Sequence, residues 1–240
     1  MATRQQMLER IRQALALPPG QLSVPGDLSA LPALGRVLSP VAPEDLVSRF
    51  EDELTKVGGS AYRARGGAEI ANLLSRILKE GRASGVVLSR NPLLARLGVG
   101  EILQSLETPA WIWPAAAGPD PAPPDAAVYR EHCFSAAAGV TGVDFALVES
   151  GSLVLTSSTE GSQLASLAPP IHIAFYLRSQ VVETLEEVLA GLAQGRAAER
   201  HRAGRSVVFV TGTSRTADIE QILIRGVHGP RELHAILVED

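Results

Sequence analysis

Polar residues able to do chemistry follow apolar runs at two places in this chain. Glu149 comes directly after the run Phe145 to Val148, in the turn Glu149-Ser150-Gly151-Ser152. A carboxylate held at a sheet edge acts as a base or a nucleophile. The other interpretation is plain exposure of Glu149 at the tip of a β-hairpin. The sequence leaves both interpretations open.

The second place is the loop TGTSRT, residues 211–216, which follows the β-branched run Val207 to Val210. We expect this run to be a buried parallel strand. From Ser206 to Asp240 the pattern predicts strand, loop, helix, loop and strand. Unpaired backbone N–H groups at a helix N-terminus suit an anion or a carboxylate. The candidate anion-binding or substrate-binding residues are therefore Thr211, Gly212, Thr213, Ser214, Arg215 and Thr216. In the alternative interpretation the loop only caps the helix, with Thr216 as N-cap and Asp218 in the first turn.

Two further side chains, Asp218 and His228, complete the candidate set around this loop. Arg215 is able to bind a carboxylate through two hydrogen bonds. His228 lies between Val227 and Gly229, in the segment Gly226 to Gly229, and a histidine exchanges a proton near neutral pH. We expect Glu149, Arg215, Asp218 and His228 to converge on one cleft, because strand-end loops gather along one edge of an α/β sheet. Glu149, His228 and Asp218 are then the candidate catalytic residues. Alternatively, Arg215 and Asp218 form an ion pair that orders the loop, and His228 caps a turn.

The elements that must position these residues alternate between helix and strand. Helical spacing recurs over residues 43–57, 68–79, 92–106 and 127–137, and strand patterns occupy 60–65, 85–89, 111–113, 171–176 and 235–238. Apolar runs on both sides of Glu149 predict a β-hairpin, and we expect His172 to be a core or strand-end histidine. The alternation predicts a three-layer α/β/α fold with a largely parallel sheet.

Two regions of different composition divide the chain. Residues 1–42 contain a short amphipathic helix, opened by the capping box Thr3 and Gln6, and a linker rich in Pro and Gly. Residues 43–240 form the α/β domain. The apolar stripe of the N-terminal helix packs either on its own domain or on a partner subunit.

Composition excludes several functional classes. A net charge of −4 and 4% aromatic residues predict no nucleic-acid partner. The N-terminus alternates charged and apolar residues, so we expect neither a signal peptide nor a membrane span, and a cytoplasmic protein. Cys133 is the only cysteine of the 240 residues, which predicts no disulfide, iron–sulfur cluster or Cys-rich zinc site in this chain. The chain lacks a dinucleotide fingerprint as well, so we expect no cofactor and no metal.

Three separated blocks carry a family resemblance: GVTGVDFALVESGSLVL, LAPPIHIAF and VTGTSRTADIEQILIRGVHGPRELHAILV. In order and spacing they resemble the lactate-utilisation protein C (LutC) family, which carries the LUD domain. The chain departs from the common family sequence at Val148 to Ser152. It also departs at Thr213, a position where Pro is frequent in the family. The resemblance implies a fold similar to the pentose-phosphate isomerase and CoA-transferase superfamily. It also implies a role in oxidising L-lactate to pyruvate alongside iron–sulfur partner proteins.

Two hypotheses of function follow from these observations. In the first, the chain is a non-redox subunit of a lactate-oxidising system, because lactate oxidation needs an electron acceptor that the chain lacks. In the second, it is a free-standing enzyme, similar to a CoA transferase or a sugar-phosphate isomerase, that uses Glu149 as nucleophile or base.

Overall fold

Residues 40–240 make up one of two units into which the chain divides, the other being Met1–Ser39. The computed structural model describes residues 5, 40–113, 126–198, 206–217, 223–226 and 228–239. The expected N-terminal helix and most of its linker lie outside these residues, so their structure and the domain boundary at residue 42 stay predictions.

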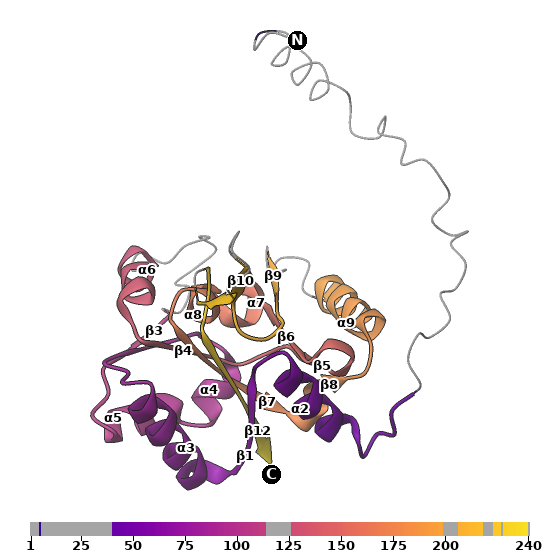
Figure 1. Cartoon of the computed structure of the whole chain (residues 1–240), viewed down its shortest axis with the longest axis horizontal. Coiled ribbons are helices and arrows are strands. Elements are labelled where there is room, and N and C mark those ends of the chain that lie inside the picture. The colour runs from indigo at the N-terminus through magenta and orange to yellow at the C-terminus, as the bar shows by residue number, and fades with distance from the viewer. Residues whose placement is uncertain are drawn as a thin grey trace. The chain divides into compact units, whose positions relative to one another are not determined.

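A parallel sheet forms the centre of the domain (Figure 1). In the described residues it has six strands in the order β1-β12-β7-β4-β2-β3, and every pair of neighbours is parallel. The register places Ala61 beside Ala235 and Ile236 beside Phe175. The inner strands are continuous apolar runs because both of their faces are covered. The strands are β1 (Ser60–Arg65), β2 (Val86–Leu88), β3 (Ala110–Ile112), β4 (Ala138–Thr141), β7 (Ile171–Leu177) and β12 (Glu232–Glu239).

Three helices cover one face of this sheet: α3 (Gly66–Glu80), α4 (Pro92–Arg96) and α5 (Val99–Ser105). The buried stripe of α3, with Ile70, Leu74 and Ile77, has the spacing that the sequence shows. Asn91 caps α4 by accepting a hydrogen bond from the backbone N of Leu93 at 2.9 Å. These helices and the sheet face beneath them form the larger part of the core.

The other face carries helices and a second sheet. The helix α2 (Leu46–Lys56) packs there beside a sheet of order β8-β5-β6-β9, and α9 (Leu185–Ala198) packs on the outer side of that sheet through Val188. The predicted hairpin is confirmed: Phe145 pairs antiparallel with Val154. The remaining elements of this layer are β5 (Phe145–Leu147), β6 (Ser152–Thr156), β8 (Val181–Val182), β9 (Val207–Val210), α6 (Ala126–Ser135), α7 (Ser157–Glu160) and α8 (Leu164–Leu167).

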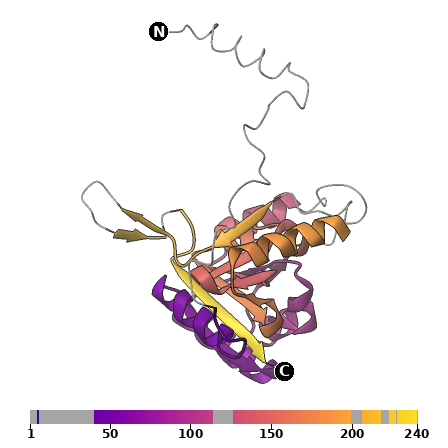
Figure 2. The same ribbon diagram turned by 90° about the vertical axis from the view of Figure 1, so that its right-hand side faces the viewer.

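The prediction of a helix after TGTSRT is wrong. In its place, β10 (Arg215–Ala217) pairs antiparallel with β11 (Leu223–Arg225), with Thr216 opposite Ile224, and the two strands stand out from the larger sheets (Figure 2). Thr216 is therefore a strand residue and not an N-cap. The run Ile222-Leu223-Ile224 fits either period, and β-branched residues favour the strand.

The strand before TGTSRT is also placed differently from the expectation. β9 is not a buried parallel strand; it pairs antiparallel with β6 at the edge of the second sheet, and Phe209 is exposed. An apolar run in the sequence does not distinguish a buried parallel strand from an antiparallel strand at the edge of a sheet.

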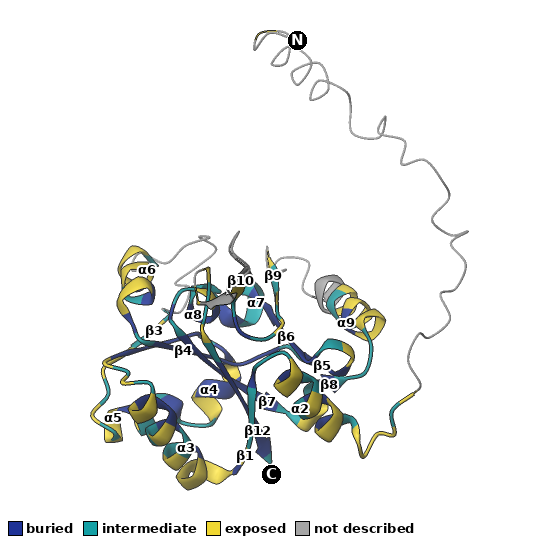
Figure 3. Ribbon diagram, viewed as in Figure 1, coloured by how far each residue is buried: buried dark blue, intermediate teal, exposed yellow. Residues whose placement is uncertain are grey.

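The fold class agrees with the prediction of an α/β domain with a largely parallel sheet. Buried residues concentrate in the strands, while the outer faces of the helices are exposed (Figure 3). Within the ranges that the structure describes, no helix combines the length and apolar character needed to cross a membrane.

Candidate functional site

The turn that carries Glu149 is a short 3-10 helix, η2 (Val148–Ser150), at the tip of the hairpin. Glu149 is exposed, and its Oε2 accepts a hydrogen bond from the backbone N of Leu185, the first residue of α9, at 3.1 Å. Its own backbone N donates to the carbonyl of Glu183 at 3.1 Å. A carboxylate in this place satisfies a free N–H group and is favoured by the helix dipole. Glu149 therefore stabilises the start of α9.

Two turns meet beside the C-terminal end of α2. Gly151 has φ 61°, and a Cβ there would collide with the backbone of Leu54. Gly212 has φ 75°, and a Cβ there would collide with the carbonyl oxygen of Val57. Only glycine allows both the left-handed conformation and this close approach. The turn of Glu149 and the TGTSRT loop thus pack closely against the same end of α2.

Hydroxyl groups connect these two turns. Ser150 Oγ and Ser152 Oγ are 2.7 Å apart, and Ser152 Oγ lies 2.6 Å from Thr211 Oγ1. Thr213 is buried, and its Oγ1 has no hydrogen-bond partner among the described residues. An unpartnered buried hydroxyl carries a desolvation cost unless a ligand or water meets it.

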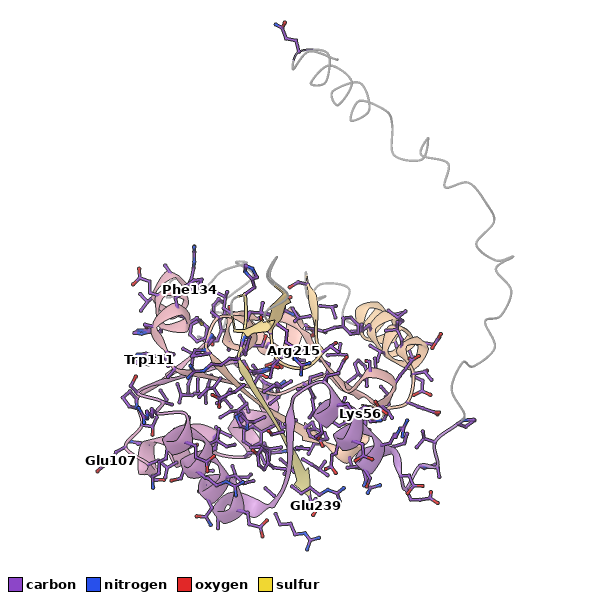
Figure 4. The ribbon with its side chains drawn as sticks, viewed as in Figure 1. Lys56, Glu107, Trp111, Phe134, Arg215 and Glu239 are labelled. Carbon is purple, nitrogen blue, oxygen red and sulfur yellow. The ribbon has the colours of Figure 1, made fainter. Side chains whose placement is uncertain are left out.

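Arg215 lies next to this hydroxyl group. Its guanidinium packs against Gly58, in the turn after α2, and Thr213 Oγ1 approaches the same glycine. In the part of the chain that the structure describes, Arg215 forms no ion pair, so the expected pair with Asp218 stays untested because residues 218–222 lie outside it. Figure 4 shows Arg215 far from Glu239, the last residue of β12. The loop therefore sits at the amino edge of the parallel sheet and not at its carboxyl edge.

His228 is carried by the loop directly before β12. Ser214 N donates to the carbonyl of Pro230 at 2.8 Å, and Gly226 N donates to the carbonyl of Ser214 at 3.0 Å. This loop is thus joined to the one that carries Arg215, and His228 is exposed on it. The structure brings the segments of Arg215 and His228 together, whereas the Glu149 carboxylate bonds to α9. Convergence of all four side chains on one cleft stays a prediction.

A buried carboxyl group that the sequence analysis missed lies on the opposite edge of the sheet. Glu160, at the end of α7, is fully buried. Its Oε2 accepts from Ser89 Oγ at 2.5 Å, and Asn91 Nδ2 donates to its Oε1. Burial raises the pKa of Glu160 to about 7, while the hydrogen bonds from Ser89 and Asn91 oppose this rise. A carboxyl group with this pKa holds or releases a proton near neutrality.

A second carboxylate, Asp144, lies near Glu160 and is held by hydroxyl and amide donors. Its Oδ2 accepts from Thr156 N at 2.7 Å and from Thr159 Oγ1 at 3.0 Å. Burial raises the pKa of Asp144, and these hydrogen bonds oppose the rise. Thr159 also lies 3.3 Å from Glu160 Oε1, so one hydroxyl group contacts both carboxyl groups.

The position of Glu160 is the one that α/β sheets use for ligands. After β2 the chain passes to α4 and α5 on one face of the sheet, and after β4 it passes to the hairpin on the other face. Because β2 and β4 are neighbours, their carboxyl ends diverge at this point, and such switch points form binding crevices. The available sequence signal was the hydroxyl-rich stretch Thr156 to Glu160 directly after a buried strand.

His172 is a core residue, as expected. It is fully buried on β7, and its Nε2 lies 2.8 Å from Thr141 Oγ1. Burial lowers the pKa of His172 to about 3, so the imidazole is neutral at physiological pH. Its Nδ1 has no hydrogen-bond partner among the residues that the structure describes.

These features define an α/β protein with a buried carboxyl group at the switch point of its parallel sheet and a hydroxyl and arginine loop at the opposite edge. Comparison with known families makes the assignment specific. The chain belongs to the LUD domain family, whose model matches residues 47–238.

Several relatives share most of the length of this chain. It is 28% identical over 204 residues to lactate utilization protein C of Halalkalibacterium halodurans, covering 85% of this chain and 84% of that protein. It is 31% identical over 173 residues to the uncharacterized protein YkgG of Escherichia coli, covering 72% of this chain and 71% of that protein. A crystal structure of a DUF162 family protein from Deinococcus radiodurans superposes with a TM-score of 0.56 at 21% identity, over 83% of this chain and 100% of that one. This last likeness establishes the fold.

Proposed function

We propose that this chain acts in lactate utilisation as a component without a redox centre of its own, and that iron–sulfur partner proteins accept the electrons. The observation that carries the proposal is the similarity, over 85% of this chain, to a protein named lactate utilization protein C. Conversion of L-lactate to pyruvate removes two electrons and two protons, so an acceptor is required. The proposed location of the system is the cytoplasm.

The only cysteine of the chain supports a division of labour between subunits. An iron–sulfur cluster requires several thiolate ligands, and this chain has Cys133 alone. Cys133 lies on α6 and is buried beside Tyr129 of the same helix, and burial raises the pKa of its thiol to about 11. A thiol in this state is a packing group and not a ligand or a nucleophile.

The loop around Arg215 is the proposed position for the carboxylate of a small hydroxy acid. Arg215 is not engaged in an ion pair within the described part of the chain, and the adjacent Thr213 hydroxyl is buried without a partner. A carboxylate would bond to both groups, since guanidinium donors form charge-assisted pairs with it. His228, on the loop joined to this one, is the proposed proton-exchanging group.

Reconstitution tests the proposed function. Lactate-dependent reduction of a dye is measured with this chain alone, with the cysteine-rich partners alone, and with both together. We expect the full rate only with both, and we expect Cys133→Ala to preserve it because the thiol binds no cluster. A full rate from the partners alone, or from this chain alone, would contradict the proposal.

A labelling experiment distinguishes the competing hypothesis of a free-standing enzyme that uses Glu149 as its nucleophile. Because Glu149 Oε2 is bonded to the backbone N of Leu185, we expect no acyl adduct when the purified chain is incubated with an acyl-CoA. Intact-protein mass spectrometry is the readout, and Glu149→Gln is the control. An adduct on the unaltered chain that disappears in Glu149→Gln would establish the competing enzyme.

A further inference from the structure

A shallow pocket of about 1000 Å³ lies at the carboxyl edge of the parallel sheet, away from the Arg215 loop. It is bounded by the ends of three neighbouring strands, β1, β12 and β7, and by the C-terminal end of α4. The first residues of the 3-10 helix η3 (Arg178–Gln180) close one side. None of the candidate residues discussed above lines this pocket. Its position is the one at which parallel α/β sheets bind ligands.

The lining of the pocket combines an apolar floor with a basic rim. Leu97, Leu177, Leu237 and Val238 contribute the apolar surface, and three arginines and one carboxylate contribute the charges. The arginines come from three separate elements: Arg65 ends β1, Arg96 ends α4 and Arg178 begins η3. The described lining residues thus carry an excess of positive charge, on a protein whose net charge is −4.

Among the described residues, Glu239 is the one carboxylate that lines the pocket, and it leaves two of these arginines unpaired. Glu239 Oε2 accepts from Arg65 Nε at 3.0 Å, and Glu239 Oε1 lies 3.8 Å from Arg63 Nη1. Arg96 and Arg178 have no ion pair within the residues that the structure describes, and both are exposed. Guanidinium groups in one pocket repel each other, and an anion bound between them relieves this repulsion.

The short helix α4 connects this pocket to the buried carboxyl group at the switch point. Asn91, which bonds to Glu160, caps the start of α4, and Arg96 lies at its end. A five-residue helix is about 8 Å long, so an anion in the pocket would lie close to the Glu160 cluster.

We propose that the pocket formed by Arg65, Arg96 and Arg178 binds an organic anion larger than lactate, through phosphate or carboxylate oxygens on the arginines and a neutral body on the leucine floor. The planar guanidinium matches both groups with paired hydrogen bonds. The volume suits a ligand of cofactor or metabolite size, since such pockets span roughly 300 to 1,000 Å³. This assignment does not depend on the proposed role in lactate utilisation.

Calorimetric titration of the full chain with inorganic pyrophosphate and, separately, with citrate tests the assignment. We expect at least one probe to bind, and the double variant Arg96→Gln with Arg178→Gln to weaken binding by about tenfold or more, since each lost charged hydrogen bond reduces affinity strongly. The matched control is Arg82→Gln with Arg130→Gln, which removes the same charge from exposed arginines outside the pocket. Binding of pyrophosphate alone assigns a phosphate ligand, and binding of citrate alone assigns a carboxylate ligand.

A gain-of-affinity variant makes the test independent of folding defects. Glu239→Gln removes the carboxylate that the described residues contribute to the pocket and frees Arg65, so we expect tighter binding of the same probe. Equal weakening in both arginine double variants would show a general charge effect and overturn the proposal. Absence of binding of either probe at millimolar concentration, or no gain in Glu239→Gln, would overturn it as well. Circular dichroism melting curves verify that each variant is folded.

Discussion

Replacement of Glu160 by Gln should change how the stability of this protein depends on pH. Glu160 is fully buried, and its pKa is raised from 4.5 to about 7, first of all by burial. Below pH 4.5 the folded and unfolded forms both hold the proton. Between pH 4.5 and about 7 the unfolded chain releases it while the folded chain keeps it, so the free energy of unfolding falls as the pH rises. Above this range both forms are ionised.

The size of this effect follows from the gap between the two pKa values. Since one pKa unit corresponds to about 1.4 kcal/mol, the gap from 4.5 to about 7 lowers the free energy of unfolding by about 3 kcal/mol. Glu160→Gln is a neutral copy of the protonated acid. Its amide oxygen is able to accept from Asn91, and its amide nitrogen is able to donate to Ser89 Oγ. We therefore expect the variant to lack this part of the pH dependence.

Urea denaturation at pH 5 and pH 8, followed by circular dichroism, measures the difference between the two proteins. The comparison with the variant is required because His172 contributes with the opposite sign: its pKa is lowered to about 3, so its contribution grows as the pH rises from 3 to 6.5. Relative to Glu160→Gln, the unaltered chain should lose about 3 kcal/mol between these pH values, a midpoint shift of roughly 1 to 2 M urea. A difference that is the same at both pH values would show that Glu160 does not hold a proton in the folded state.

Three further predictions concern the two edges of the sheet. Gly151→Ala should destabilise the domain by roughly 2 kcal/mol or more and lower its melting temperature, because the residue has a positive φ and the new Cβ would collide with the backbone of Leu54. An unchanged melting temperature would contradict the close packing of this turn against α2. Asn91→Ala removes both the cap of α4 and a donor to the buried Glu160, so we expect the free energy of unfolding, measured by urea denaturation, to fall by roughly 2 to 4 kcal/mol. A decrease below about 1 kcal/mol would show that neither hydrogen bond contributes. Arg215→Ala should lower the lactate-dependent rate of the reconstituted system while leaving the circular dichroism spectrum unchanged, with Arg130→Ala as the control, since an exposed arginine contributes little to stability; equal rates for both variants would exclude Arg215 from substrate binding.

The identity of most elements was predictable from the sequence because their patterns arise from local chemistry. Stripes such as Ile70, Leu74 and Ile77 have the period of a helix, and Glu149-Ser150-Gly151-Ser152 between two apolar runs indicates a hairpin. The single cysteine restricts the chemistry of the chain whatever the fold is. The three family blocks likewise are continuous segments of the chain, so they are recognisable without the fold.

Tertiary structure decided which strands pair and which edge each loop occupies. The segment after Thr211 contains β-branched and polar residues that suit either a helix or a hairpin, and the pairing of Thr216 with Ile224 settles it as a hairpin. The run Val207 to Val210 shows no sign that its partner is β6 of a second sheet. Strand order depends on packing between distant segments, so the placement of Arg215 at the amino edge was not available from spacing.

The buried carboxyl group depends on tertiary structure in the same way. Glu160 stands beside serine and threonine in the sequence, where a carboxylate is ordinarily exposed. Only the fold brings it against Ser89 and Asn91, some seventy residues earlier, and removes it from water. Residue type gives Glu160 an ionisable carboxyl group, and burial determines the pH at which this group loses its proton.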